Sequence, residues 1–136
     1  MPLDLAALRD FAIRYTGAWC SQNAVSVASF FSPNGSLTIN DGTPSIGRVA
    51  ITDAAQSFMS AFPDLVILMD CIIERDDRTE YHWTLIGTNT GAGGTGNPVR
   101  ISGFERWLFD PDGLIRESEG HFDVADYRRQ LTGTPS

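Results

Sequence analysis

The end of the chain holds a histidine and an aspartate that could exchange protons. His121 and Asp123 stand two residues apart, so in a regular strand their side chains share one face. An imidazole beside a carboxylate can work as an acid/base couple, and His121 is one of only two histidines in the chain. The alternative is structural: Asp123 caps the helix that follows, and His121 braces that turn.

A third candidate is Glu105, a lone carboxylate on an otherwise apolar strand face. Alternation over residues 98–109 places Glu105 with Val99, Ile101 and Trp107. In a dry setting the pKa of this carboxyl would rise, and the group could act as an acid or base. The alternative is an ion pair at the rim with an arginine such as Arg106 or Arg116.

The remaining candidates would contact a ligand. Tyr15 could donate a hydrogen bond to a ligand carbonyl, or could belong to the core of its helix. Asn40 is either a turn former or a polar group at the mouth of a hollow. With the inward-facing aromatic and polar residues of the helix and strands, the candidate contacts are Tyr15, Trp19, Asn40, Trp83, Asn89, Trp107, Ser118 and Phe122.

The last strand can be assigned in two ways. One alternation turns Leu114, Arg116, Ser118, Gly120 and Phe122 inward, and the other turns Ile115, Glu117, Glu119, His121 and Asp123 inward. Burying three carboxylates in a row is costly, which favours the first set over most of the strand. Gly120 predicts a bulge, which would swing His121 and Asp123 relative to the preceding residues.

Helices are expected in the first half of the chain and strands in the second. Apolar spacing predicts a helix from Leu5 to about residue 20, capped by Asp4, and a third helix over 48–61 that Pro63 ends. Between them we expect a short helix after Asn23 that includes Phe31, a strand at 37–39 and a turn at 40–44. Alternation then predicts strands at 65–75, 79–90, 98–109 and 114–123, with a last helix over 124–131.

This order is typical of an α+β fold. Helices would pack on one face of a curved antiparallel sheet and leave a cone-shaped hollow as the binding site. Length predicts a single domain over 1–136. The glycine-rich GAGGTG at 91–96 joins two strands and precedes no helix, so it is a hairpin loop and not a phosphate loop.

Composition excludes several partners. A net charge of −7 with scattered arginines argues against nucleic acid, and no apolar run is long enough for a membrane span. The two histidines have no metal-ligand spacing, so no metal and no cofactor are expected. Cys20 and Cys71 are predicted to be reduced and buried, as in a cytoplasmic protein without a signal peptide.

Four strings in order carry a family resemblance: FPDL at 62–65, WTLIGTNTG at 83–91, DGLI at 112–115 and HFDVADYRRQL at 121–131. With them the chain resembles the nuclear transport factor 2-like superfamily and, within it, the SnoaL-like polyketide cyclase group. The resemblance implies a cone-shaped α+β barrel and a homodimer, formed through an outer sheet face carrying His82, Thr84, Phe104 and Arg106. It also implies an acid/base role for Asp123. Asn89 stands where the group has a histidine, and Gly120 where related epoxide hydrolases have their aspartate.

Two functions remain open. The first is a protein that binds a small apolar, ring-shaped molecule and catalyses cofactor-free proton transfer, such as an aldol-type cyclisation or isomerisation. Asp123 would take the proton, His121 would relay it, and Asn89 and Tyr15 would stabilise the oxyanion. The second is a non-catalytic ligand-binding or dimerisation module, which the non-titratable Asn89 and Gly120 favour. An inward-pointing carboxylate or imidazole would distinguish them.

Overall fold

A computed structural model describes residues 4–133 of the chain as four helices and six strands. In chain order they are α1 (Leu5–Cys20), α2 (Ala24–Ala28), β1 (Phe31–Ile39), β2 (Ser45–Ile46), α3 (Arg48–Ala61), β3 (Val66–Arg75), β4 (Arg78–Thr88), β5 (Pro98–Phe109), β6 (Ile115–Phe122) and α4 (Val124–Thr132). The three longer helices and the four long strands expected from the sequence are confirmed. The predicted single domain over 1–136 includes residues 1–3 and 134–136, which lie outside the described residues.

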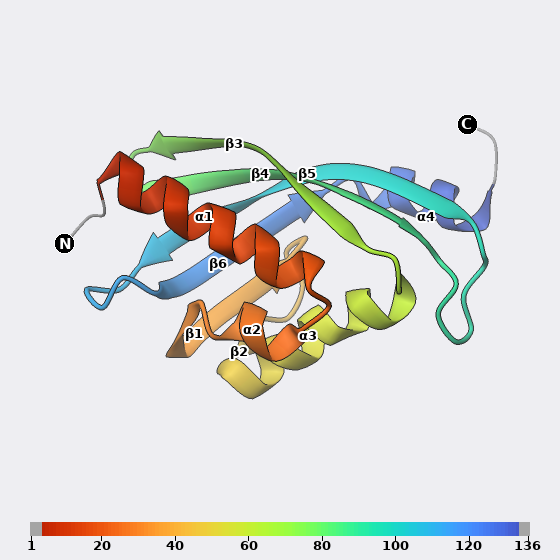
Figure 1. The fold of residues 1–136 in the computed structure, drawn as a ribbon, viewed down its shortest axis with the longest axis horizontal. Coiled ribbons are helices and arrows are strands. Elements are labelled where there is room, and N and C mark those ends of the chain that lie inside the picture. The colour runs from red at the N-terminus through yellow and green to blue at the C-terminus, as the bar shows by residue number, and fades with distance from the viewer. Residues whose placement is uncertain (1–3, 134–136) are drawn as a thin grey trace.

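The strands form one curved sheet in the order β2-β1-β6-β5-β4-β3. All neighbours are antiparallel except β1 and β6, which are parallel. Figure 1 shows α1, α2 and α3 packed on one side of this sheet, with α4 at the far end beside β5. The predicted α+β class with a cone-shaped arrangement is therefore confirmed. Within the described residues the sheet is mixed and does not close, because β2 and β3 are its edges.

The N-terminal strand is longer than the sequence predicted. The second helix ends at Ala28, and Phe31, expected in that helix, opens β1 and is fully buried. The pairing of β1 with β6 shifts between Phe31 and Ser36, so the Pro33-Asn34-Gly35 segment bulges inside the strand and does not end a helix. A side chain at position 35 would lie 2.8 Å from the Ile115 carbonyl oxygen, which explains the glycine.

The predicted bulge at Gly120 is wrong. Pairing between β5 and β6 is regular from Gly103 opposite Phe122 to Leu108 opposite Glu117, and it shifts only beyond that, where Phe109 pairs with Ile115. The irregularity therefore lies at Arg116, which is exposed, whereas Ile115 is buried. Ser118, Gly120 and Phe122 face inward as expected, but His121 and Asp123 keep the regular alternation and do not turn inward.

An aromatic cluster holds α1 on the sheet. Tyr15 of α1 contacts Tyr81 of β4 and Trp107 of β5 edge-on, with ring centroids 5.5 and 5.2 Å apart. Tyr81 and Trp107 in turn stack with centroids 4.8 Å apart. All three rings are almost completely buried, so this contact fixes the distance between helix and sheet beside the cavity.

Candidate functional site

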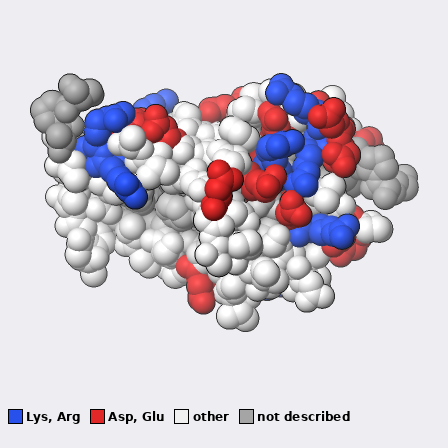
Figure 2. All heavy atoms as spheres, turned by 180° about the vertical axis from the view of Figure 1, so that it is seen from behind, with Lys and Arg blue, Asp and Glu red and all other residues white. Residues whose placement is uncertain are grey.

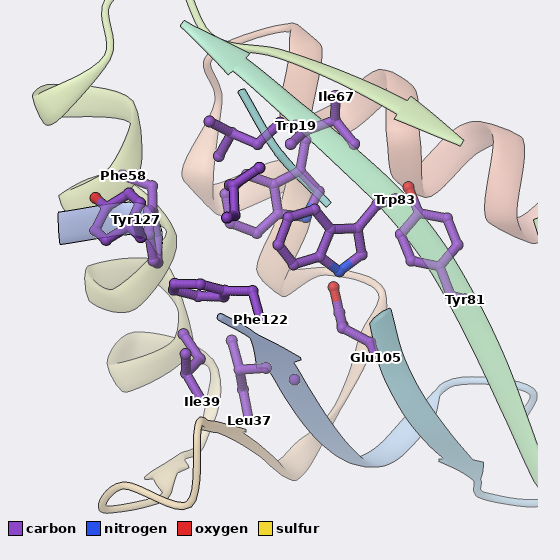
Figure 3. Close-up of a pocket in the computed structure, with 13 residues that line it drawn as sticks. Trp19, Leu37, Ile39, Phe58, Ile67, Tyr81, Trp83, Glu105, Phe122 and Tyr127 are labelled. Carbon is purple, nitrogen blue, oxygen red and sulfur yellow. The ribbon is translucent and has the colours of Figure 1, made fainter. Parts of the chain in front are cut away.

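A cavity opens between the helices and the inner face of the sheet (Figure 3). The space open to the centre of a water molecule is about 60 Å³, several times what one water needs. Its walls are mostly apolar and come from eight elements together: Trp19, Leu37, Ile39, Phe58, Ile67, Tyr81, Trp83, Leu85, Ile101, Glu105, Gly120, Phe122 and Tyr127. Among these described residues, Glu105 carries the one carboxyl group.

Three neutral donors hold the Glu105 carboxylate. Its Oε1 accepts hydrogen bonds from the Ser118 hydroxyl at 2.8 Å, the Trp107 indole Nε1 at 3.0 Å and the Tyr15 hydroxyl at 3.0 Å. Its Oε2 accepts only a second, longer contact of 3.1 Å from the same Tyr15 hydroxyl. Oε1 is therefore saturated, and Oε2 is the oxygen with free acceptor capacity.

The environment of Glu105 raises its pKa. The side chain is 7% exposed, and burial disfavours its charged form more than the bonds from Trp107, Ser118 and Tyr15 favour it. Among residues 4–133 no cation lies within ion-pair distance of it: Arg116 Nε is 3.9 Å from Asp110, and Arg106 alternates with Glu105 on β5 and faces the other side. The rim ion pair considered for Glu105 is thus not found.

The two tyrosines beside Glu105 stay protonated. Burial raises the pKa of the Tyr15 phenol well above its usual range, and the nearby Glu105 charge raises it further. Burial likewise raises the pKa of Tyr81, whose hydroxyl is hydrogen-bonded to Thr16 of α1. Both phenols are neutral at physiological pH, so Tyr15 keeps the proton with which it donates to Glu105.

The cavity also contains an indole N–H without a partner. Trp83 Nε1 is buried and has no hydrogen-bond acceptor in the described part of the chain. In Figure 3 this nitrogen and the Glu105 carboxyl group point toward one another. The sequence predicts Trp83 as a ligand contact and does not predict that its N–H lacks a partner. Trp83 pairs with Gly103 on the next strand. A glycine opposite a tryptophan leaves room for the indole ring to lie across the sheet, and this is the sequence feature that could have predicted its position.

The structure brings seven of the predicted site residues together. Four of them line the cavity, namely Trp19, Trp83, Glu105 and Phe122. Three lie directly behind Glu105 and bind it: Tyr15, Trp107 and Ser118. Sequence reasoning did not list as site residues the contributions of β1, α3 and α4, which are Leu37, Ile39, Phe58 and Tyr127. Apolar spacing predicts buried positions but does not separate core residues from cavity wall.

The predicted acid/base pair lies away from the cavity. Asp123 is exposed and caps α4, accepting a hydrogen bond from the Asp126 backbone N–H at 3.1 Å. His121 lies on the outer face of the sheet, with its ring 5.3 Å from that of Phe104. Asp123 is therefore a helix cap, which was the structural alternative to an acid/base role. Because the strand has no bulge at Gly120, neither His121 nor Asp123 is turned toward the cavity.

Both predicted asparagines organise loops. The Asn89 amide nitrogen donates to the Ala61 carbonyl at 3.1 Å, and its oxygen accepts from the Thr95 backbone N–H at 2.8 Å. These bonds tie the 91–97 loop to the end of α3 and leave Asn89 outside the cavity lining. Asn40 has φ 51° and accepts from the Phe122 backbone N–H at 2.9 Å, so it is the turn former of the two alternatives.

The side of the molecule that faces away from the viewer in Figure 1 carries charges of both signs. Figure 2 shows basic and acidic groups side by side and no continuous basic surface. Arg78 pairs with Glu117 at 3.0 Å, and His82 contacts Glu80 at 3.2 Å. No helix in the described residues is long and apolar enough to cross a membrane. Cys20 and Cys71 are free thiols, and both are exposed, which corrects the prediction that they are buried.

Comparison with known proteins identifies the family. The model of the SnoaL-like polyketide cyclases matches residues 9–131, so the chain belongs to this family. No curated protein matches its sequence. Similar solved structures include a candidate SnoaL-like polyketide cyclase from Jannaschia sp. CCS1, with 12% identity over 99% of both chains and a TM-score of 0.82.

Two further structures share the fold. AclR from Streptomyces galilaeus, a candidate hydroxylase, has 20% identity, covers 98% of this chain and 85% of its own, and has a TM-score of 0.80. A protein from Catenulispora acidiphila with a ketosteroid isomerase-like fold, in complex with trimethylamine, has 13% identity, covers 93% and 94%, and has a TM-score of 0.79. At such low sequence identities these similarities establish the cone-shaped fold only. The activity has to be argued from the residues of the site.

The raised pKa of Glu105 predicts how stability depends on pH. The folded protein takes up this proton at a higher pH than the unfolded chain, so as pH falls from 8 to the ordinary glutamate pKa of about 4.5 wild type should gain stability relative to Glu105→Gln. The slope for one proton is at most about 1.4 kcal/mol per pH unit. Denaturant unfolding of both proteins across this range measures it, and a difference that is flat or that shrinks toward low pH contradicts the burial argument.

Proposed function

We propose that the cavity binds a small apolar, ring-shaped molecule and that Glu105 exchanges protons with it without a cofactor. One observation carries this proposal: a buried carboxyl group without a cation partner faces an apolar cavity. Such a group takes up a proton at a higher pH than an exposed carboxyl group does, and it lies within reach of a bound molecule. The reaction type is an aldol-type cyclisation or an isomerisation.

The bonding of Glu105 selects the oxygen that works. Because Oε1 accepts three hydrogen bonds, the exchanged proton resides on Oε2. Oε2 takes a proton from a carbon next to a ligand carbonyl: the C–H bond breaks, an O–H bond forms, and the electron pair moves to the carbonyl oxygen as an enolate. Returning the proton to another carbon gives an isomer. Attack of the enolate carbon on a second carbonyl closes a ring, and the alkoxide formed there takes the proton back from Oε2, which restores the carboxylate. Neither route needs an oxidant or reductant.

This assignment differs from the roles expected at first for Asp123, His121 and Asn89. The Asp123 carboxylate and the Asn89 amide are hydrogen-bonded elsewhere, and His121 is on the far side of the sheet. Glu105 takes over as the base because it is the described carboxyl group on the cavity wall. The description of the family as polyketide cyclases supports ring closure among the two reaction types.

The proposal is tested by deuterium exchange into a simple cyclic ketone. Wild type should accelerate exchange of the protons next to the carbonyl of 1-indanone in D₂O, followed by NMR, and Glu105→Gln should lower this rate about 10²- to 10⁴-fold. Asp123→Asn is the matched control: asparagine also caps a helix, so we expect the exchange rate and the fold to survive.

Two results contradict the proposal. Exchange that persists in a folded Glu105→Gln protein removes Glu105 from the chemistry. Binding of 1-indanone by wild type without any exchange favours the second function, a non-catalytic ligand-binding module.

We further propose that two copies pair through the outer face of the sheet. Ile67 lines the cavity, so its neighbours Val66 and Leu68 turn outward, and each is 42% exposed. On the same face Phe104 lies between His82 and His121, at centroid distances of 5.4 and 5.3 Å. A second copy would remove these apolar side chains from water.

Light scattering tests the dimer. Wild type should have twice the mass of one chain, and Phe104→Arg should shift the protein toward the monomer because it places a charge in the contact. Val49→Arg changes another exposed apolar residue, 79% exposed on α3, and should leave the mass unchanged. A wild-type monomer at high concentration contradicts the proposal.

We propose the cytoplasm as the compartment. Cys20 and Cys71 are free thiols exposed at the surface. Exposed thiols persist in a reducing environment and tend to oxidise outside it.

A further inference from the structure

The unpartnered indole N–H of Trp83 has a chemical consequence. Buried donors are almost always hydrogen-bonded, and leaving one unpaired is costly. Trp83 Nε1 is buried without an acceptor in the described part of the chain, and its ring lines the cavity. The acceptor that satisfies this N–H is therefore to be sought in a molecule bound in the cavity.

The sheet register fixes where this N–H lies. Trp83 pairs with Gly103, and a side chain at position 103 would lie 2.7 Å from Trp83 Cζ2. The glycine thus lets the indole lie across β5. Glu105 follows two residues later on the same face of β5, within the reach of diagonal neighbours on a sheet. Figure 3 shows the indole nitrogen and the carboxyl group pointing toward one another, and no hydrogen bond joins them.

The walls determine the charge of the molecule that fits. Among the described lining residues none is Arg, Lys or His, and the single carboxyl group already lacks a counter-ion. A ligand carboxylate or phosphate would lie beside Glu105 in an apolar setting with no cation to offset the repulsion. The acceptor that meets Trp83 Nε1 is for this reason a neutral oxygen.

We propose that the ligand is a neutral cyclic ketone whose carbonyl oxygen accepts a hydrogen bond from Trp83 Nε1 and whose neighbouring carbon faces Glu105. This rests on the proposed function and specifies its substrate class. When Oε2 of Glu105 takes the proton from that carbon, the electron pair moves to the oxygen, and the Trp83 N–H stabilises the resulting enolate. Trp83 then both selects the ligand and contributes to the reaction.

Calorimetric binding of two matched probes tests the proposal. 1-Indanone carries the carbonyl, and indane has the same rings without oxygen. Replacing Trp83 by Phe keeps an aromatic wall and removes the donor, so the indanone-to-indane affinity ratio should fall about three- to tenfold. Phe58→Leu changes the cavity wall without removing a donor and should alter both affinities alike, leaving the ratio as in wild type.

The infrared carbonyl stretch of bound 1-indanone gives a second readout, which does not depend on the comparison with indane. It should lie at lower frequency than in a hydrocarbon solvent, and it should return toward that value in Trp83→Phe. A bound carbonyl stretch like that in hydrocarbon, or an affinity ratio that Trp83→Phe does not change, overturns the role of Trp83 but leaves ligand binding in the cavity intact. If wild type binds neither probe, both this inference and the proposed function fail.

Discussion

The hydrogen bonds to Glu105 join the parts of the fold that create the cavity. Tyr15 reaches it from α1, Trp107 from its own strand, and Ser118 from β6. A buried carboxylate without a cation is tolerated only where neutral donors replace water, so the position of these elements and the state of this group depend on each other. The stacked rings of Tyr81 and Trp107 exclude solvent from the same place.

Two glycines make room beside this carboxyl group. Gly103 allows the Trp83 ring to cross β5, where any side chain would also collide with the His121 carbonyl oxygen at 2.3 Å. Gly120 faces Glu105 across the strand pair, and a methyl group there would make only ordinary contacts, the nearest at 3.7 Å. At Gly103 the backbone requires glycine. At Gly120 the backbone does not require glycine, and the missing side chain leaves space in the cavity that a ligand can fill.

The sequence predicted much of this arrangement because local periodicity sets it. Alternation alone turned Glu105, Ser118 and Phe122 inward, and helical spacing put Tyr15 and Trp19 on the inner side of α1. The same reasoning was wrong for the end of β6 because of one irregularity. The bulge lies at Arg116 and not at Gly120, so His121 and Asp123 point away from the cavity. A glycine permits a bulge but does not require one, and strand pairing decided its position.

Other features depended on contacts between distant segments. Asn89 is satisfied by Ala61 and Thr95, which no local pattern relates to it. The Trp83 N–H lacks an acceptor, and this can be recognised only when the positions of all neighbouring groups are known. Phe31 left the predicted helix because the buried strand pairing of β1 with β6 outweighs the weak preference of a five-residue helix.

The most direct test of the account is an NMR titration of the Glu105 side-chain carboxyl carbon, labelled with ¹³C and assigned by its loss in Glu105→Gln. The account predicts a pKa above the ordinary glutamate value of about 4.5, because burial outweighs the three donated hydrogen bonds. A pKa at or below that value would mean that the donors stabilise a permanent carboxylate. Glu105 would then be a structural anion and not the proton carrier of the cavity.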